Sequence, residues 1–442
     1  MKRSLSGRNA SWVRVVLALV AVPASAMLIQ PNSAAGDSGF QAGANQVVGA
    51  ELPLAWSPTE NIAWTATIVG YGQSTPVVAH DLMVVTSTSG PKKETYHVVA
   101  IDPDDGQPRW QLDVDNPSPF DNTPMVSRAA PSAVATEFGF CAFFEGGLVV
   151  GVDTEGHQIW QRDLVSEFGP VDARHGLAAS LESDGQRVYV WVERSESPYV
   201  LCLEPDSGES IWKVEGVGAT AWASPRLIDV ASSQHLVCSA IGKVIGLDPL
   251  TGKRLWEFDD IANNSSCTPM PVGDGRFLIG ASDGRNAASS GEAAANNGLI
   301  QIQPQGDQFE VDYAWRAEKA TSTFGSPVVA GSTAAFVNRT GVLYRLDMET
   351  GQQLSVARTD AGGIWATPLV TSEYIYLMGY KGVTAVVRLS DGEQVAANRA
   401  WPSADESAGF GGGHTLYAGI AVGDRLILRR GDMLFAIGEK TP

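Results

Sequence analysis

The chain has 442 residues and a formal net charge of −18, because 49 Asp and Glu residues outnumber 31 Lys and Arg residues. Nucleic acid and anionic membrane surfaces attract basic patches, so this charge balance argues against both as partners. A solvated acidic surface is the plain interpretation, and an acidic face for a basic protein or for cations is the alternative.

The first 26 residues resemble a secretory signal peptide. They carry four basic residues and no acidic one, an apolar core at 15–22 and a small-residue cleavage motif at 23–26. The apolar core is too short for a stable membrane span, and no Cys stands at the cleavage site to receive a lipid. We therefore expect an exported protein, periplasmic or extracellular and not lipid-anchored. A flexible lead-in is expected over 27–59.

A block made of an acidic residue, two or three further residues, Gly, three residues and Trp recurs along the chain. Four copies stand at 102–110, 153–160, 204–212 and 248–256, and two without the Trp at 347–354 and 389–395. A second signal, mostly Ser, Thr or Ala followed by Pro and a short apolar run, begins each unit. The eight starts from Pro76 to Ala418 give a mean period of about 49 residues, which is typical of the four-stranded blade of a β-propeller.

The strand pattern is clearest in the fourth unit. Short runs rich in Val, Ile and Leu stand at 225–230, 235–240, 243–248 and 253–258, and Gly, Asp or Pro ends each run. No stretch after the signal combines helical spacing of apolar residues with caps. The sequence thus predicts an all-β chain of four-stranded antiparallel blades.

Counting the units predicts eight blades. They are 73–114, 127–164, 176–216, 221–260, 265–318, 322–360, 364–401 and 415–440. The eighth has only three strands, and we expect 60–68 to supply the fourth, so that strands from both ends of the chain close the ring and remove an open sheet edge. Seven blades are the alternative, if the weak eighth unit merges with its neighbour.

One tryptophan recurs at the same place in the expected outer strands. An indole there can bury apolar area against the adjacent blade while its N–H finds a backbone acceptor. We therefore predict a structural docking role, and not ligand contact, for Trp64, Trp110, Trp160, Trp212 and Trp256.

The block at 247–256, Leu-Asp-Pro-Leu-Thr-Gly-Lys-Arg-Leu-Trp, closely resembles the tryptophan-docking repeat of the pyrroloquinoline-quinone-like (PQQ-like) β-propellers. The resemblance covers roughly 60–440 and implies a single propeller domain there. That family includes quinoprotein alcohol dehydrogenases and the propeller protein of outer-membrane barrel assembly. Because one scaffold hosts both enzymes and binding proteins, the resemblance is specific for the fold and not for the function.

The resemblance also implies what an enzyme of this family needs. Its quinoprotein members hold PQQ in the central funnel with calcium, a catalytic aspartate and a disulfide between two adjacent cysteines. This chain has no Cys-Cys pair, and its two largest insertions, 281–298 and 401–414, have the composition of loops. It also lacks a zinc or haem motif, a nucleophile elbow and a phosphate loop. We expect no catalytic residue, metal or cofactor; a PQQ- and calcium-dependent dehydrogenase is the alternative.

Four cysteines fall in different units: Cys141, Cys202, Cys238 and Cys267. An exported protein could oxidise them, but three lie inside apolar runs typical of buried strands. The sequence leaves disulfides and buried free thiols open.

The residues just before each inner strand are expected to line the entrance of the central channel. Trp222, Phe324 and Trp365 would form an aromatic patch there. The polar groups around that patch would come from Arg128, Arg174, His175 and His414. Concave apolar sites with a few convergent polar groups are the usual ligand sites. The alternative is that these aromatic side chains only pack into the loops between blades.

Together these features predict an exported, non-catalytic propeller that acts as a scaffold for protein–protein interaction. A role in cell-envelope assembly, with envelope proteins as partners, follows from the family resemblance alone. The protein is expected to be a monomer. A glycan or small-ligand binder that uses the funnel is a further alternative, as is an extended peptide added to an outer blade edge.

Overall fold

The structure is a computed structural model, and the chain divides into two units, Met1–Asn32 and Ser33–Pro442. All residues that the structure describes belong to the second unit: 45–46, 51–123, 126–173, 175–194, 196–219, 222–264, 266–282, 293–402 and 413–440. The predicted signal peptide lies outside the described residues.

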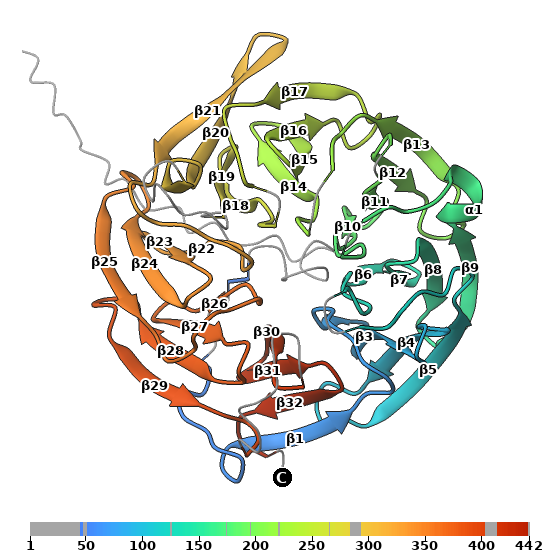
Figure 1. The fold of residues 1–442 in the computed structure, drawn as a ribbon, viewed down its shortest axis with the longest axis horizontal. Coiled ribbons are helices and arrows are strands. Elements are labelled where there is room, and N and C mark those ends of the chain that lie inside the picture. Colours follow the sequence, from blue (N-terminus) through green and yellow to red (C-terminus); the bar gives the residue numbers. More distant parts are fainter. Residues whose placement is uncertain are drawn as a thin grey trace, which may run out of the picture. The chain divides into compact units, whose positions relative to one another are not determined.

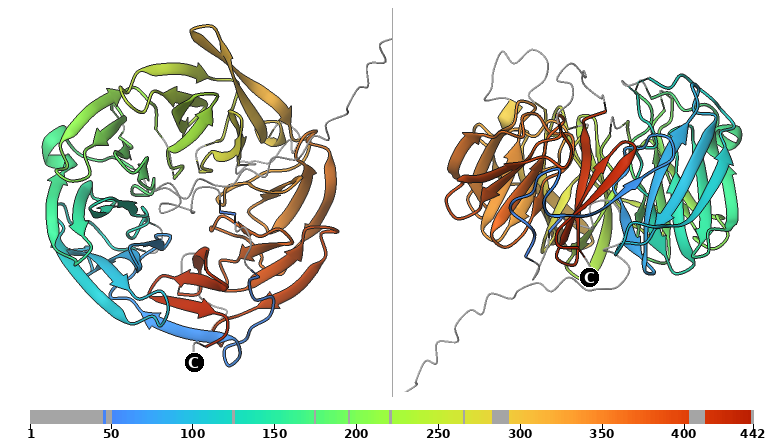
Figure 2. Two further views of the ribbon diagram at one scale, coloured as in Figure 1. Left: turned by 180° about the vertical axis from the view of Figure 1, so that it is seen from behind. Right: turned by 90° about the horizontal axis from the view of Figure 1, so that it is seen from below.

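The second unit is an eight-bladed β-propeller (Figures 1 and 2). Each blade is a four-stranded antiparallel sheet, and the first strand of each of the first seven blades lies nearest the channel (Figure 1). The fold class and blade number predicted from the repeat are therefore confirmed, and the seven-blade alternative is wrong.

The first four blades follow the chain order without a crossover. Blade 1 contains β2 (Val77–Ala79), β3 (Leu82–Ser89), β4 (Thr95–Ile101) and β5 (Pro108–Asp115). Blade 2 contains β6 (Val134–Thr136), β7 (Gly139–Phe143), β8 (Leu148–Asp153) and β9 (Gln158–Asp163). Blade 3 contains β10 (Glu182–Ser183), β11 (Val188–Val192), β12 (Tyr199–Leu203) and β13 (Ser210–Glu215). Blade 4 contains β14 (Arg226–Val230), β15 (Ser233–Ala240), β16 (Lys243–Leu247) and β17 (Arg254–Phe258).

The remaining blades repeat this arrangement. Blade 5 contains β18 (Met270–Gly273), β19 (Arg276–Ile279), β20 (Gly298–Gln305) and β21 (Gln308–Arg316). Blade 6 contains β22 (Val328–Ala330), β23 (Thr333–Val337), β24 (Val342–Asp347) and β25 (Gln353–Arg358). Blade 7 contains β26 (Leu369–Val370), β27 (Tyr374–Met378), β28 (Thr384–Arg388) and β29 (Gln394–Asn398). Blade 8 contains β30 (Leu416–Val422), β31 (Arg425–Arg430), β32 (Met433–Ile437) and β1 (Ile62–Thr67).

Strand β1 closes the ring as the sequence predicts. It pairs antiparallel with β32, and the register places Trp64 opposite Ala436. Both edges of β32 are thereby paired, so the chain ends leave no gap in blade 8.

Two local features differ from the sequence analysis. A one-turn helix, α1 (Leu164–Phe168), follows blade 2, and the side chain of Asp163 caps it by accepting from two backbone N–H groups. The described end of the expected lead-in, 51–59, packs on blade 7: Trp56 is buried, and Asn398 accepts from its backbone N–H at 3.2 Å. Among the described residues, no helix is long and apolar enough to cross a membrane.

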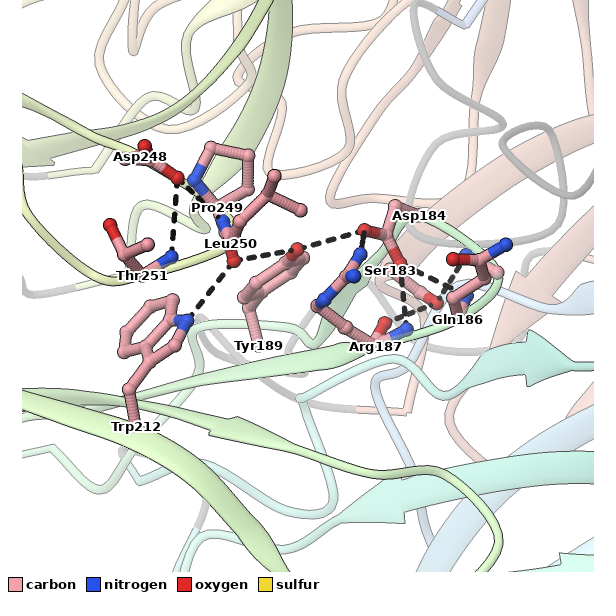
Figure 3. A network of polar contacts seen from close by, with 11 residues as sticks. Ser183, Asp184, Gln186, Arg187, Tyr189, Trp212, Asp248, Pro249, Leu250 and Thr251 are labelled. Carbon is pink, nitrogen blue, oxygen red and sulfur yellow. Dashed lines mark hydrogen bonds and ion pairs between the residues drawn. The ribbon is translucent and has the colours of Figure 1, made fainter.

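A tryptophan locks each blade to the next at most junctions, as Figure 3 shows for blades 3 and 4. The indole Nε1 of Trp212 donates to the Pro249 carbonyl at 3.1 Å. Asp248 holds the turn by accepting from the backbone N–H of Leu250 at 2.8 Å. Gly252 has φ +71° and lies under the indole ring, where a Cβ would come within 2.8 Å of the ring atoms. The acidic residue and the glycine of the repeat thus shape a socket for the preceding blade's tryptophan.

Three more of the predicted docking tryptophans have the same geometry. Trp64 donates to Pro103 O at 3.2 Å, Trp110 to Thr154 O at 2.9 Å and Trp160 to Pro205 O at 2.9 Å.

Trp256 is buried in one cluster with Phe277 and Ile300 of blade 5, as its docking role predicts, but the backbone acceptor predicted for its indole needs a correction. Its Nε1 donates at 2.9 Å to Nδ1 of His235, a residue of its own blade. Blade 5 lacks the acidic-residue–glycine turn that would supply a carbonyl. Trp315, which the sequence analysis missed, instead joins blade 5 to blade 6 by donating to Met348 O at 2.8 Å. The sequence contains the pattern that predicts this docking role, because the copy of the repeat at 347–354 supplies a socket and Trp315 stands in the preceding outer strand.

Candidate functional site

A cavity of about 170 Å³ lies where the segments before the innermost strands converge. All eight blades contribute to its lining, which comprises Asn45, Gln73, Thr75, Val126, Ser127, Ala130, His175, Ala178, Trp222, Ser266, Thr268, Phe324, Ser326, Trp365, Thr367, Tyr417, Ala418 and Gly419. The repeat explains this arrangement, because each unit brings the same short segment to the channel.

Aromatic side chains form a continuous arc around the cavity. Ring centroids lie 6.0 Å apart for His175 and Trp222, and 5.5 Å apart for Trp222 and Phe324. The arc continues from Phe324 to Trp365 at 6.0 Å and from Trp365 to Tyr417 at 5.8 Å. These separations and the tilted ring planes are those of favourable aromatic pairs.

Blades 8, 1 and 2 extend the arc with polar groups. The hydroxyls of Tyr417 and Tyr71 lie 2.9 Å apart. The guanidinium of Arg128 stacks over the ring of Tyr71 at 3.6 Å, a cation–π geometry. Burial and the neighbouring Tyr417 raise the pKa of Tyr71, so this phenol stays protonated and can donate a hydrogen bond.

A chain of hydroxyl groups links the blades beside the aromatic arc. At six successive junctions, from blade 1 to blade 7, a backbone N–H at the start of one blade donates to a Ser or Thr hydroxyl of the next blade, at 2.8–3.0 Å. The sequence of residues is Thr75, Ser132, Ser180, Ser224, Thr268, Ser326 and Thr367. The hydroxyls of the Ser/Thr-Pro signal, together with those of Ser132 and Ser180, which do not precede a proline, thus join neighbouring blades at the channel.

A buried ion pair holds the cavity wall contributed by blade 2. Lys93 Nζ lies 2.9 Å from Glu145 Oε1, with neither side chain exposed, and it also donates to the carbonyl of Ser127. Glu145 in turn accepts from the backbone N–H of Ala129 at 2.9 Å. Burial lowers the pKa of Lys93 and raises that of Glu145, while their mutual attraction opposes both shifts. The pair thereby fixes the path of the rim segment that contains Arg128.

The structure brings together most of the predicted rim residues. Trp222, Phe324, Trp365 and His175 line the cavity, whereas Arg128 reaches its edge through Tyr71. Arg174 lies outside the described residues.

His414, also predicted at the rim, is not among the residues that line the cavity. It stacks on Trp401 instead, and its Nδ1 accepts from the indole Nε1 at 3.1 Å.

The sequence analysis missed two aromatic members of the site, Tyr71 and Tyr417. In the eighth unit, the register between β30 and β31 shifts between Leu416 and Ala418, and this irregularity accompanies the placement of Tyr417 at the cavity.

The lining does not fit a calcium-bound quinone. Calcium takes six to eight oxygen ligands that usually include carboxylates, and no Asp or Glu is present among the described residues of the lining. Elsewhere in the described chain, Asp153, Glu155 and His157 could hold a metal together, but they form a largely exposed turn between β8 and β9 and are not among the residues that line the cavity.

All four cysteines are buried free thiols. Burial raises the pKa values of Cys141, Cys202 and Cys267 to about 12, which makes these thiols poor nucleophiles. The sequence left both disulfides and buried free thiols open, and the structure has free thiols.

Comparison with known proteins identifies the family. The model of the family described as outer membrane protein assembly factor BamB matches residues 35–174 and 145–398. Two curated relatives with that description are each 22% identical to the chain. The match to the protein of Moranella endobia covers 53% of this chain and 60% of the relative, and that of Shewanella oneidensis covers 54% and 78%.

Solved structures share the fold at low sequence identity. The crystal structure of BamB from Moraxella catarrhalis has a TM-score of 0.58 and 15% identity, and the alignment covers 86% of this chain and 97% of that one. A europium-containing methanol dehydrogenase has a TM-score of 0.55 and 11% identity, with 88% of each chain covered. The chain therefore belongs to the BamB family of PQQ-like β-propellers.

Proposed function

We propose that this chain is an exported, non-catalytic propeller that binds a segment of a partner protein at the channel entrance during cell-envelope assembly. Family membership supports the setting, because the matching relatives are described as outer membrane protein assembly factors. The two curated relatives are only 22% identical to this chain, so the chemistry of its own site defines the kind of partner it takes.

The aromatic arc is the observation that carries the proposal. Trp222, Phe324 and Trp365 come from three different blades, are each only partly buried, and face one cavity. Aromatic side chains held in place by one another provide large contact area at little cost in conformational entropy, and Trp, Tyr and Arg dominate the binding energy of protein interfaces.

The polar surroundings favour a peptide over a purely apolar ligand. Serine and threonine hydroxyls lie beside the arc, and Gln73 adds an amide group to the lining. Backbone N–H and C=O groups of an extended segment would find partners there while its apolar side chains meet the rings.

Photocrosslinking in cells tests this proposal directly. Ser266 lines the cavity without belonging to the arc, so a photoreactive residue at this position leaves the aromatic groups intact. We expect it to crosslink to an envelope protein, and we expect the yield to fall at least about tenfold when Trp222 and Trp365 are both replaced by Ala. The same photoreactive residue at Leu250, which is exposed on a blade turn, serves as the control.

Equal yields with and without the two tryptophans would overturn the proposal. The competing enzyme hypothesis has its own test, which is the addition of PQQ and Ca²⁺ to the purified protein. A bound absorbance band together with reduction of a dye by alcohols would show a dehydrogenase instead.

A further inference from the structure

Two residues from outside the blades lie at the inner edge of blade 7. Figure 1 shows them as the short blue segment beside β26. Gln46 forms an isolated parallel bridge with Val370. The backbone N–H of Val370 donates to the carbonyl of Asn45 at 3.1 Å. These two residues therefore pair with the inner edge of the blade 7 sheet at the channel, which is the edge of β26 that does not contact β27.

The side chain of Asn45 strengthens this attachment. Its Nδ2 donates to the carbonyls of Thr367 and Pro368, at 3.2 and 2.6 Å. Asn45 is 2% exposed and lines the same cavity as the aromatic arc. One primary amide thus uses both of its protons on adjacent carbonyls.

The chemistry of this edge defines what can occupy it. An innermost strand has one neighbour in its blade, so its other edge offers backbone N–H and C=O groups to any extended chain that enters the channel. The carbonyls of Thr367 and Pro368 accept only, so a side chain between them must donate. A primary amide fits this requirement, and a carboxylate is repelled.

We infer that the inner edge of blade 7 is a binding site for a peptide that carries an asparagine in the left-handed conformation of Asn45 (φ +54°), and that Asn45 and Gln46 are its intramolecular occupant. This rests on the proposed function of the cavity and deepens it, since it names the class of segment that the partner presents. The partner's segment displaces the chain's own residues from Val370 and from the two carbonyls. Because a tethered segment has a high effective concentration, the resident segment weakens the apparent affinity for the partner.

A pair of isosteric variants of the full chain tests the inference. Asn45→Asp removes the amide donor and places a carboxylate against two carbonyls, whereas Gln46→Glu adds the same charge to the exposed neighbour. Hydrogen exchange over 366–371 reports on the Val370 amide. We expect its exchange to speed up at least about tenfold in Asn45→Asp and to stay unchanged in Gln46→Glu.

A labelled peptide with the sequence of residues 43–49 is the probe for the vacated site. Its fluorescence anisotropy is expected to show binding to Asn45→Asp at least about tenfold tighter than to the wild-type chain or to Gln46→Glu. The same peptide with Asp in place of Asn should not bind. Unchanged exchange at Val370, or equal peptide affinity in all three proteins, overturns the inference.

These outcomes separate the inference from the proposed function. Suppose that the exchange and peptide results are as expected, but no crosslink from Ser266 depends on the aromatic arc. The edge site is then supported, and the partner role of the cavity is ruled out. If the crosslinks depend on the arc but exchange at Val370 is unchanged, the partner role of the cavity stands and the edge site is ruled out.

Discussion

The rings of Trp222 and Phe324 lie 5.5 Å apart although blade 5 stands between their blades in the chain. The described residues that blade 5 contributes to the lining, Ser266 and Thr268, carry no aromatic ring. Because blade 5 places no aromatic ring between them, Trp222 of blade 4 and Phe324 of blade 6 contact each other directly and the arc is continuous.

Phe324 joins the two tryptophans, so its removal should interrupt the arc. Phe324→Ala is expected to lower the crosslinking yield from Ser266 about tenfold while costing less than about 3 kcal/mol of unfolding free energy, because the ring is only partly buried. Urea denaturation measures the second quantity. Phe138→Ala, at an exposed phenylalanine of blade 2, is the matched control and should leave the yield unchanged.

The socket under Trp212 can be tested with two glycines of nearly equal conformation. Gly252 and Gly242 have φ values of +71° and +74°. A Cβ at Gly252 would lie 2.7 Å from Val214 and 2.8 Å from Trp212, whereas nothing lies within 4 Å at Gly242. Both Ala variants share the backbone cost of about 1 kcal/mol, so Gly252→Ala should be less stable than Gly242→Ala by a further 1–3 kcal/mol or so. Equal urea midpoints would show that the contact contributes nothing.

His235 should make the protein less stable in mild acid. Its Nδ1 accepts from Trp256 and its ring is buried, and this burial lowers the pKa from 6.5 to about 4. Above pH 6.5 both folded and unfolded states hold it neutral. Between pH 6.5 and 4 the unfolded state takes up the proton and the folded state does not, so about 3 kcal/mol of stability is lost as pH falls through that range.

Urea denaturation at pH 7 and pH 4.5 measures this loss. His235→Gln keeps an acceptor for Trp256 and should lose less stability over the range than the wild-type chain. His157→Gln, at an exposed histidine, should behave like wild type. If His235→Gln lost as much stability as the wild-type chain over this pH range, His235 would not be the cause of the loss.

The buried pair below the rim should be strongly coupled. Lys93→Met leaves the Glu145 carboxyl buried without its partner and is expected to cost about 3–5 kcal/mol in urea denaturation. Adding Glu145→Gln, which can still accept from Ala129, should restore part of that loss. Strictly additive effects in the double variant would show that the two groups do not interact.

The four thiols should be unreactive in the folded protein. Each is buried, and a raised pKa leaves little thiolate at pH 8. A thiol reagent is expected to label none of them within minutes under native conditions and all four in guanidinium. Fewer than four labelled thiols after unfolding without reductant would reveal a disulfide.

The blade count and the closing strand could be predicted because the repeat encodes them locally. Each acidic-residue–glycine turn and each Ser/Thr-Pro start depends on a few neighbouring residues, and Trp64 by itself indicates that β1, the partner of β32, is an outer strand. The acceptor of the Trp256 indole could not be predicted in this way, because the acceptor of a docking indole belongs to the next blade. A blade with a different turn leaves that indole to bond within its own blade, as it does with His235.

The sequence by itself determined which part of each unit forms the site: its period showed that one short segment of every unit must reach the channel, and so selected Trp222, Phe324 and Trp365. Only the tertiary structure decided which side chains meet. Tyr71 and Tyr417 are 346 residues apart and touch through ring closure, a bulge moved Tyr417 into place, and His414 turned away to Trp401. Asn45 reached blade 7 from outside the repeat altogether. Periodicity constrains neighbours along the chain, whereas contacts across a closed ring depend on the register and bulges of strands that no local pattern contains.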